Sequence, residues 1–131
     1  TNATTSNTLV SYLVTGATDE VQLNISPTGV INLTINGVTT SSAASAVLID
    51  GKQHHVSVSW DNTNGDVRFY VDGQWVGSTT GVKTGYTIAA GGTLVIGQDQ
   101  DGLDSGYQTA DTFKGTLYDV RVWNSAISRQ V

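Results

Sequence analysis

The chain has 131 residues, with 11 acidic and six basic side chains and a formal net charge of −5 at pH 7. The basic residues are scattered, which leaves no basic patch for phosphates, and we expect no nucleic-acid partner. There is no cysteine, which excludes disulfides and thiolate metal sites. The longest apolar runs are only a few residues, so we expect no membrane insertion. The length suits a single domain with one core.

Short strands joined by tight turns are expected, because the chain has 15 glycines, one proline and many Val, Thr, Ser and Ile residues. Turn pairs such as Asn36-Gly37, Asn64-Gly65 and Asp72-Gly73 separate apolar runs. In chain order, the predicted strands are residues 9–14, 21–25, 30–35, 54–60, 67–71, 75–78, 93–96 and 113–123.

Apolar and polar residues alternate in several of these runs, for example over 67–71, which predicts one buried and one solvated face for each strand. The pattern indicates an antiparallel sandwich of two layers. In the last run the step from Leu117 to Val120 is odd, whereas the step from Val120 to Val122 is even. We therefore predict a bulge near Tyr118 and Asp119 that keeps all three apolar residues inward.

An acidic loop follows the apolar run Leu94-Val95-Ile96. Carboxylates crowded into one loop repel one another, and a divalent cation with oxygen ligands is the simplest way to hold them together. The residues alone leave two interpretations open, a calcium site and a solvated acidic loop. The loop contains the oxygen-bearing side chains of Asp99, Gln100, Asp101, Asp104, Gln108 and Asp111.

The run His55-Val56-Ser57-Val58-Ser59-Trp60 resembles the pentraxin signature His-x-Cys-x-Ser/Thr-Trp, with Ser57 in place of the cysteine. Three further segments resemble the same family in the same order: Val71-Asp72-Gly73 its hairpin turn, residues 96–101 its calcium loop, and residues 113–123 its closing strand. Together these segments identify the chain as similar to pentraxin and laminin G-like domains, which have the concanavalin A-like jelly roll.

The resemblance implies a calcium site. Where the family's loop has an acid, a main-chain carbonyl and a second acid, this chain has Asp99, Gln100 and Asp101. Further along, Gln108 and Asp111 match two more ligand positions with the acid and the amide exchanged. The segment Thr18-Asp19-Glu20-Val21 resembles the family's other ligand-bearing segment and would bring Asp19 and Glu20 to the same ions.

The chain departs from the family in two ways. Ser57 replaces the cysteine, so the family's disulfide cannot form. The chain also starts after the point at which the family's first core strands would lie. We therefore expect a single domain over residues 1–131 that lacks the N-terminal strands and has an exposed sheet edge.

The function implied by the resemblance is calcium-dependent binding of a carbohydrate or a similar polar ligand, by a lectin-like module of a larger secreted or cell-surface protein. A bound calcium ion can accept two vicinal hydroxyls. Asp104 and Tyr107 are the predicted ligand contacts, and Tyr107 could equally be a residue that fills a turn. Trp75, after the Asp72-Gly73 turn, is a weaker candidate.

Two other functions are alternatives for the acidic loop. In the first, calcium only orders the loop of a structural or protein-binding adhesin module. In the second, Asp99-x-Asp101-x-x-Asp104 resembles the Glu-x-Asp-x-x-Glu motif of laminarinase-type glycoside hydrolases, in which two carboxylates flank the bond that is cleaved. All three acids are the shorter aspartate here, and Gly102-Leu103 interrupts the strand that would hold them on one face. We therefore expect no enzyme.

The sequence also predicts which histidine and tryptophan side chains are buried. His54 and His55 are adjacent on a predicted strand, so they point to opposite faces and cannot bind one metal together. We expect one of them to pack in the core with its ring hydrogen-bonded and the other to be exposed. Trp60 and Trp123 fall at core positions of the family.

Overall fold

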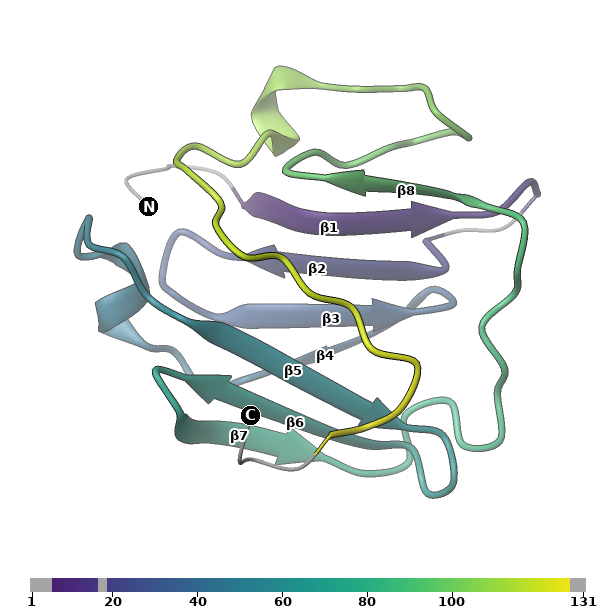
Figure 1. Cartoon of the computed structure of the whole chain (residues 1–131), viewed down its shortest axis with the longest axis horizontal. Helices are drawn as coiled ribbons and strands as arrows, with labels where there is room; N and C mark the ends of the chain where they lie inside the picture. The colour runs from purple at the N-terminus through teal and green to yellow at the C-terminus, as the bar shows by residue number, and fades with distance from the viewer. Residues whose placement is uncertain (1–5, 17–18, 128–131) are drawn as a thin grey trace.

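The computed structural model describes residues 6–16 and 19–127, and it arranges them in two packed β-sheets (Figure 1). The elements in chain order are β1 Asn7–Leu13, β2 Val21–Ile25, β3 Ile31–Ile35, β4 Val38–Ser41, η1 Ala46–Ile49, β5 Val56–Asp61, β6 Asp66–Val71, β7 Gln74–Thr79, β8 Thr93–Ile96 and η2 Thr109–Asp111. The two η elements are short 3-10 helices.

The five-stranded sheet has the order β4-β3-β2-β1-β8, and the three-stranded sheet has the order β5-β6-β7. All strand pairs of both sheets are antiparallel. Strand β8 is far along the chain from β1, yet it pairs with it, with Val10 opposite Ile96 and Leu13 opposite Thr93. This arrangement confirms the prediction of an all-β antiparallel sandwich.

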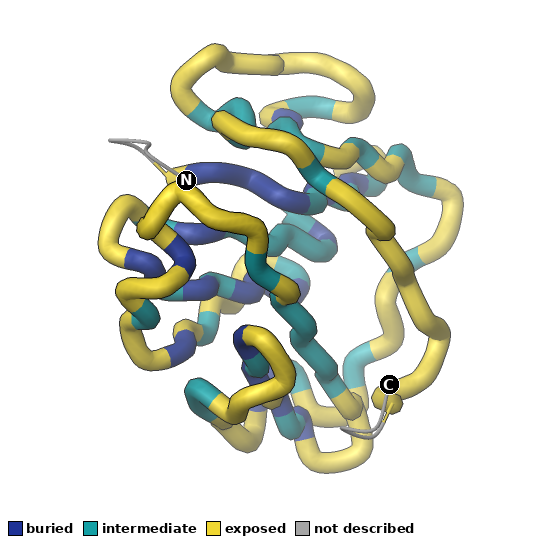
Figure 2. Tube along the Cα trace, turned by 60° about the vertical axis from the view of Figure 1, so that its left-hand side comes forward, coloured by how far each residue is buried: buried dark blue, intermediate teal, exposed yellow. Residues whose placement is uncertain are grey.

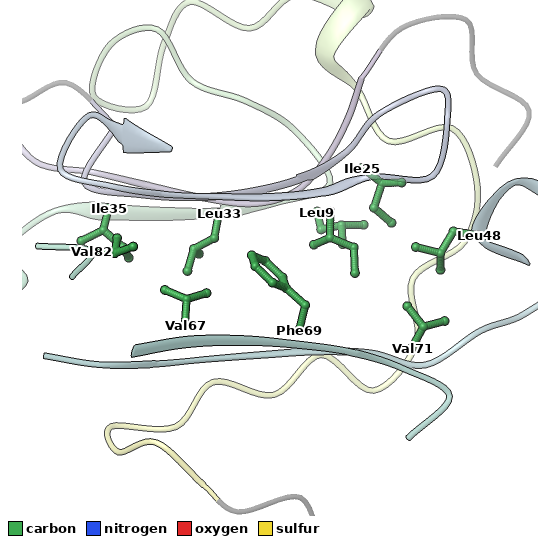
Figure 3. Close-up of a cluster of buried hydrophobic side chains, with 10 residues drawn as sticks. Leu9, Ile25, Leu33, Ile35, Leu48, Val67, Phe69, Val71 and Val82 are labelled. Atoms are coloured by element: carbon green, nitrogen blue, oxygen red, sulfur yellow. The ribbon is translucent and has the colours of Figure 1, made fainter. Parts of the chain in front are cut away.

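The core lies between the two sheets, because alternate residues of each strand face the opposite layer (Figure 3). In β6, Val67, Phe69 and Val71 are buried, whereas Arg68 between them is exposed. The helix η1 contributes the buried Leu48 at one end of the core. The buried apolar cluster consists of Leu9, Ile25, Ile31, Leu33, Ile35, Leu48, Val67, Phe69, Val71 and Val82.

Strand β4 was missed by the sequence analysis. Its residues are Val-Thr-Thr-Ser, and the strand lies at the edge of its sheet with most positions exposed. A strand that buries no face has no apolar alternation, which is the signal used to find strands. The turn before it was found, since Asn36-Gly37 joins β3 to β4 with positive φ at both residues.

The prediction of a strand over residues 113–123 was wrong. The structure has an irregular segment there, and Asp119 adopts a left-handed conformation with φ of 52°. A left-handed residue turns the chain, so the alternation toward the core does not continue past it. Phe113 and Leu117 still pack against the core, but residues 118–127 are exposed (Figure 2).

Of the two tryptophans predicted to lie in the core, one does and one does not. Trp60 of β5 packs against the core, and its Nε1 donates a hydrogen bond to the Val82 carbonyl at 2.8 Å. Trp123 is 52% exposed, so its predicted core position was wrong. Trp75 is 60% exposed on β7, as expected for a residue that follows the hairpin turn.

Candidate functional site

The acidic loop begins directly after β8 and arches beyond this strand before the chain returns across the molecule (Figure 1). Both ends of the loop meet at one glycine. The Gly97 N–H donates to the Leu9 carbonyl at 2.8 Å, and the Phe113 N–H donates to the Gly97 carbonyl at the same distance. The loop is therefore closed at its base and fixed to β1.

A second brace joins the two arms of the loop. The Gln98 Nε2 donates to the Gln108 carbonyl at 2.8 Å, and the Thr112 hydroxyl donates to the Gln98 Oε1. Asp111 is half-buried in η2, and its N–H donates to the same Gln108 carbonyl. These contacts place Gln108 and Asp111, two of the predicted ligands, on the arm opposite Asp99.

Asp19 lies close enough to Asp99 and Asp101 to be affected by their charges. The pKa of Asp19, which precedes β2, is raised above its usual range first by burial and then by the negative charges of Asp99 and Asp101. Asp99 Oδ1 accepts the Gln100 N–H at 3.0 Å, and Asp101 Oδ2 accepts Gln108 Nε2 at 2.7 Å. The structure thus brings Asp19 from the β1–β2 connection to the acidic loop, a proximity that the sequence could only suggest. Thr18 lies outside the described residues.

The side chain of Gln100 faces away from these carboxylates. It is 1% exposed, and its amide hydrogen-bonds Ser11, Thr93 and Asp104. Gln100 can therefore contribute only its main-chain carbonyl to an ion.

Glu20 has a different set of partners from Asp19. Its buried carboxylate accepts the Tyr86 hydroxyl at 2.8 and 3.0 Å and the Ala89 N–H at 2.6 Å. These bonds occupy both carboxylate oxygens and tie β2 to residues 86–89. We therefore leave Glu20 out of the proposed ligand set.

The two predicted ligand-contacting residues are exposed and bonded to each other. The Tyr107 hydroxyl donates to Asp104 Oδ1 at 2.5 Å, which raises the pKa of the tyrosine. Tyr107 is 47% exposed. The Asp104 carboxylate thus orients an aromatic ring at the outer rim of the loop.

The donors of the loop are all oxygen atoms, which is the set that calcium prefers. Asp19, Asp99 and Asp101 supply carboxylates, and a cation would offset both the burial and the repulsion by Asp99 and Asp101 that raise the pKa of Asp19. Within residues 6–16 and 19–127, however, no three His, Asp or Glu side chains converge closely enough to hold an ion as they stand. The donor chemistry fits calcium, and the side chains would have to close around it.

One cluster of charged residues was not foreseen. The ring of His54 lies between Asp72 and Asp50, with Nδ1 2.7 Å from Asp72 Oδ2 and Nε2 2.9 Å from Asp50 Oδ1. His55 is exposed. The expectation of one hydrogen-bonded and one exposed histidine is confirmed, but the expected core position is wrong, because the bonded His54 ring lies outside the buried apolar cluster and is held by surface carboxylates. The sequence offered one signal for this cluster: Asp50 and Asp72 each precede a glycine in a predicted turn, and His54 follows the first of these turns.

The described residues contain no helix long and apolar enough to cross a membrane. The solved structure of a native heptameric SAP-like pentraxin from Limulus polyphemus superposes on the chain with a TM-score of 0.85 and 25% identity, covering 98% of this chain and 61% of that one. The fold is therefore the jelly-roll sandwich of the concanavalin A-like class, as predicted.

The Pentaxin family matches residues 1–131, and the chain belongs to this family. Sushi, von Willebrand factor type A, EGF and pentraxin domain-containing protein 1 of Rattus norvegicus is 34% identical over 94% of this chain and 3% of that protein. C-reactive protein 1.4 of Limulus polyphemus is 27% identical over 94% of this chain and 52% of that protein. The chain thus spans about half or less of these relatives, and the first shows that such a segment occurs within a much larger protein.

Members of the family bind calcium, and they bind their ligands in a calcium-dependent way without acting as enzymes. These properties agree with the oxygen donors of the acidic loop. They leave the ligand of this chain to be proposed from its own residues.

Proposed function

We propose that the chain is a calcium-dependent binding module for a carbohydrate or a similar polar ligand, without enzymatic activity. The observation that carries the proposal is the acidic loop that bears Asp99 and Asp101, which is closed at its base by the Gly97 and Phe113 backbone bonds and braced across its arms by Gln98. Calcium with an open coordination position supplies affinity for paired hydroxyls. We place the module in a larger extracellular or cell-surface protein.

The protein's own residues have separate roles in this proposal. Asp19, Asp99, Asp101 and the Gln100 carbonyl hold the ion, with Gln108 and Asp111 on the opposite arm. The braces at Gly97 and Gln98 keep the two arms together. Tyr107 offers a ring face that can stack on the apolar face of a sugar, and Asp104 fixes its orientation.

Calcium should stabilise the fold, because an ion that binds only the native state adds about 2.7 kcal/mol at a hundredfold excess over Kd. The measurement is the melting temperature in millimolar calcium and in excess chelator. An unchanged melting temperature, together with no binding heat in calorimetry, would refute the calcium site.

The Asp101→Asn variant locates the site. It removes one charge but preserves size, so we expect calcium affinity to fall by about tenfold or more and ligand binding to be rescued by added calcium. Asp66→Asn is the matched control, since Asp66 lies on β6 in the other sheet. Equal calcium affinities for the two variants would place the ion elsewhere.

The ligand itself is tested on a glycan array in calcium and in chelator. We expect binding only in calcium, and we expect Tyr107→Ala to weaken sugar binding without changing calcium affinity. Sugar binding that resists chelator would move the site to an aromatic surface such as Trp75. Calcium binding with no sugar bound would favour the structural module, and hydrolysis of a β-glucan by the wild type would favour the hydrolase.

A further inference from the structure

Gln100 is the one buried side chain of the acidic loop. It is 1% exposed, although it lies between Asp99, which is half-buried, and Asp101, which is exposed. A buried side-chain amide needs hydrogen-bond partners for both of its polar atoms. The partners of Gln100 come from three separate parts of the chain.

The amide nitrogen connects the loop to two paired strands. Nε2 donates to the Ser11 carbonyl of β1 at 3.2 Å and to the Thr93 carbonyl of β8 at 2.7 Å. These strands are neighbours in the five-stranded sheet. The Gln100 side chain thereby attaches the acidic loop to the sheet at a second point, in addition to the backbone bond between Gly97 and Leu9.

The amide oxygen fixes the next part of the loop. Oε1 accepts the Asp104 N–H at 3.0 Å, just inside a tight turn in which Gly102 and Ser105 exchange backbone hydrogen bonds. One side chain therefore holds both the start of the loop and its first turn. On either side of the buried Gln100, Asp99 is half-buried and Asp101 is exposed.

We propose that Gln100 is the positioning residue of the acidic loop, and that its buried amide holds residues 99–104 against β1 and β8 before any ion binds. The inference rests on the proposed calcium site for its functional meaning. It explains why an amide stands between two acids. A carboxylate at this position would face the carbonyls of Ser11 and Thr93 without a donor, and an apolar side chain would lose all three hydrogen bonds that Gln100 makes.

The first experiment uses wild-type protein in chelator. Hydrogen exchange of the Asp104 amide is measured against its rate in an unstructured peptide of the same sequence. We expect strong protection, because the anchor forms without the ion. Exchange at the peptide rate would overturn the proposal, and this result does not depend on any variant folding.

The second experiment compares Gln100→Met with Ser42→Ala. The control also removes buried bonds to backbone, since the Ser42 hydroxyl accepts the Ile31 N–H at 3.0 Å and donates to the Ala43 carbonyl at 2.7 Å, away from the loop. We expect calcium affinity to fall by about 10- to 100-fold in Gln100→Met, as for other residues that orient metal ligands, and to stay unchanged in Ser42→Ala.

The outcomes separate this inference from the proposed function. Wild-type affinity for calcium in Gln100→Met, or an equal loss in both variants, would overturn the positioning role. Failure of the wild type to bind calcium would instead refute the calcium site, and the exchange of the Asp104 amide would still decide whether Gln100 anchors the loop.

Discussion

His54 shows how a single side chain couples protonation to the fold. A neutral imidazole has one N–H, yet both ring nitrogens of His54 lie within hydrogen-bond distance of a carboxylate. Only the imidazolium can donate to Asp72 and Asp50 together. The hydrogen bonds to Asp72 and then Asp50 accordingly raise the pKa of His54. The ring joins the β6–β7 turn to the end of η1.

The carboxylates on either side respond in the opposite direction. The pKa of Asp72 is lowered first by the His55 N–H and then by His54, and that of Asp50 first by His54 and then by the Lys52 N–H. The side chains of Lys52 and His55 add smaller favourable charges. The three-residue contact is therefore fully formed only when the acids are ionised and the histidine is protonated.

The expected consequence is a stability that depends on pH through His54. A group whose pKa is raised in the folded state stabilises the fold below its unfolded pKa, about 6.5 for histidine, and loses this contribution as pH rises through the folded pKa. The pKa values of Asp50 and Asp72 are lowered in the folded state, so the stability that these two carboxylates contribute is lost as pH falls through their folded pKa values. Urea unfolding from pH 5 to 9 should show a fall in stability with rising pH.

His55 provides the control for this prediction. His54→Gln should remove the pH dependence between pH 6 and 9, whereas His55→Gln should leave it in place, because the His55 ring is exposed. Proton NMR titration should give His54 a pKa above the ordinary histidine value. A His54 pKa at the ordinary value would show that the paired carboxylates do not act on this ring.

At the scale of the element, the β5–β6 hairpin depends on a glycine at its turn. Gly65 has φ of +68°, and its carbonyl accepts the Val82 N–H at 3.0 Å. A Cβ built there would lie 2.4 Å from the Val82 nitrogen and 2.6 Å from its oxygen. The hairpin turn is packed directly against backbone, which cannot move aside as a flexible side chain can.

Gly65→Ala should therefore destabilise the protein more than Gly81→Ala. Gly81 has φ of +79° with nothing within 4 Å of its added Cβ, so alanine there should cost only the left-handed conformation, about 1–2 kcal/mol. At Gly65 the overlap should add roughly 1–3 kcal/mol more. Urea midpoints of the two variants test the difference, and equal midpoints would mean that the 80–82 segment moves away freely.

Local signals in the sequence predicted most of the elements but not all of them. The β2–β3 and β5–β6–β7 regions were found because apolar alternation and glycine turn pairs agree there. Strand β4 has turn chemistry without alternation, and residues 113–123 have apolar spacing that the left-handed Asp119 interrupts. Both errors occur where tertiary position, and not local pattern, decides the conformation.

The site shows the same division. The acidic loop could be recognised because its charges are contiguous in sequence. The buried bonds of Gln100 and Glu20 could not be recognised, because Ser11 and Tyr86 are 89 and 66 residues away from them. Side-chain type predicted the donors, whereas only the fold shows which of these side chains point inward.

At the scale of the whole molecule, the two sheets differ in size, with five strands facing three. The side chains of the edge strand β8 are poorly covered by the smaller sheet. Leu94 and Ile96 are 49% and 50% exposed, whereas their partners on β1, Tyr12 and Val10, are half-buried. The opposite edge of this sheet, strand β4, is better protected, because its end is bonded to β7 of the other sheet. The Ala43 N–H donates to the Val76 carbonyl, and the Thr40 hydroxyl donates to the Thr79 hydroxyl.

A strand at the edge of a sheet that exposes apolar side chains favours contact with another chain. We therefore expect the 131-residue chain to self-associate through β8, and we expect Ile96→Lys to reduce this association, because a lysine at a strand edge opposes edge-to-edge pairing. Val38→Lys is the matched control, since Val38 is 43% exposed on β4 at the other edge. Sedimentation velocity over a range of concentrations gives the measurement. A monomeric wild type at high concentration, or an association lost in Val38→Lys and kept in Ile96→Lys, would show that β8 is not the contact.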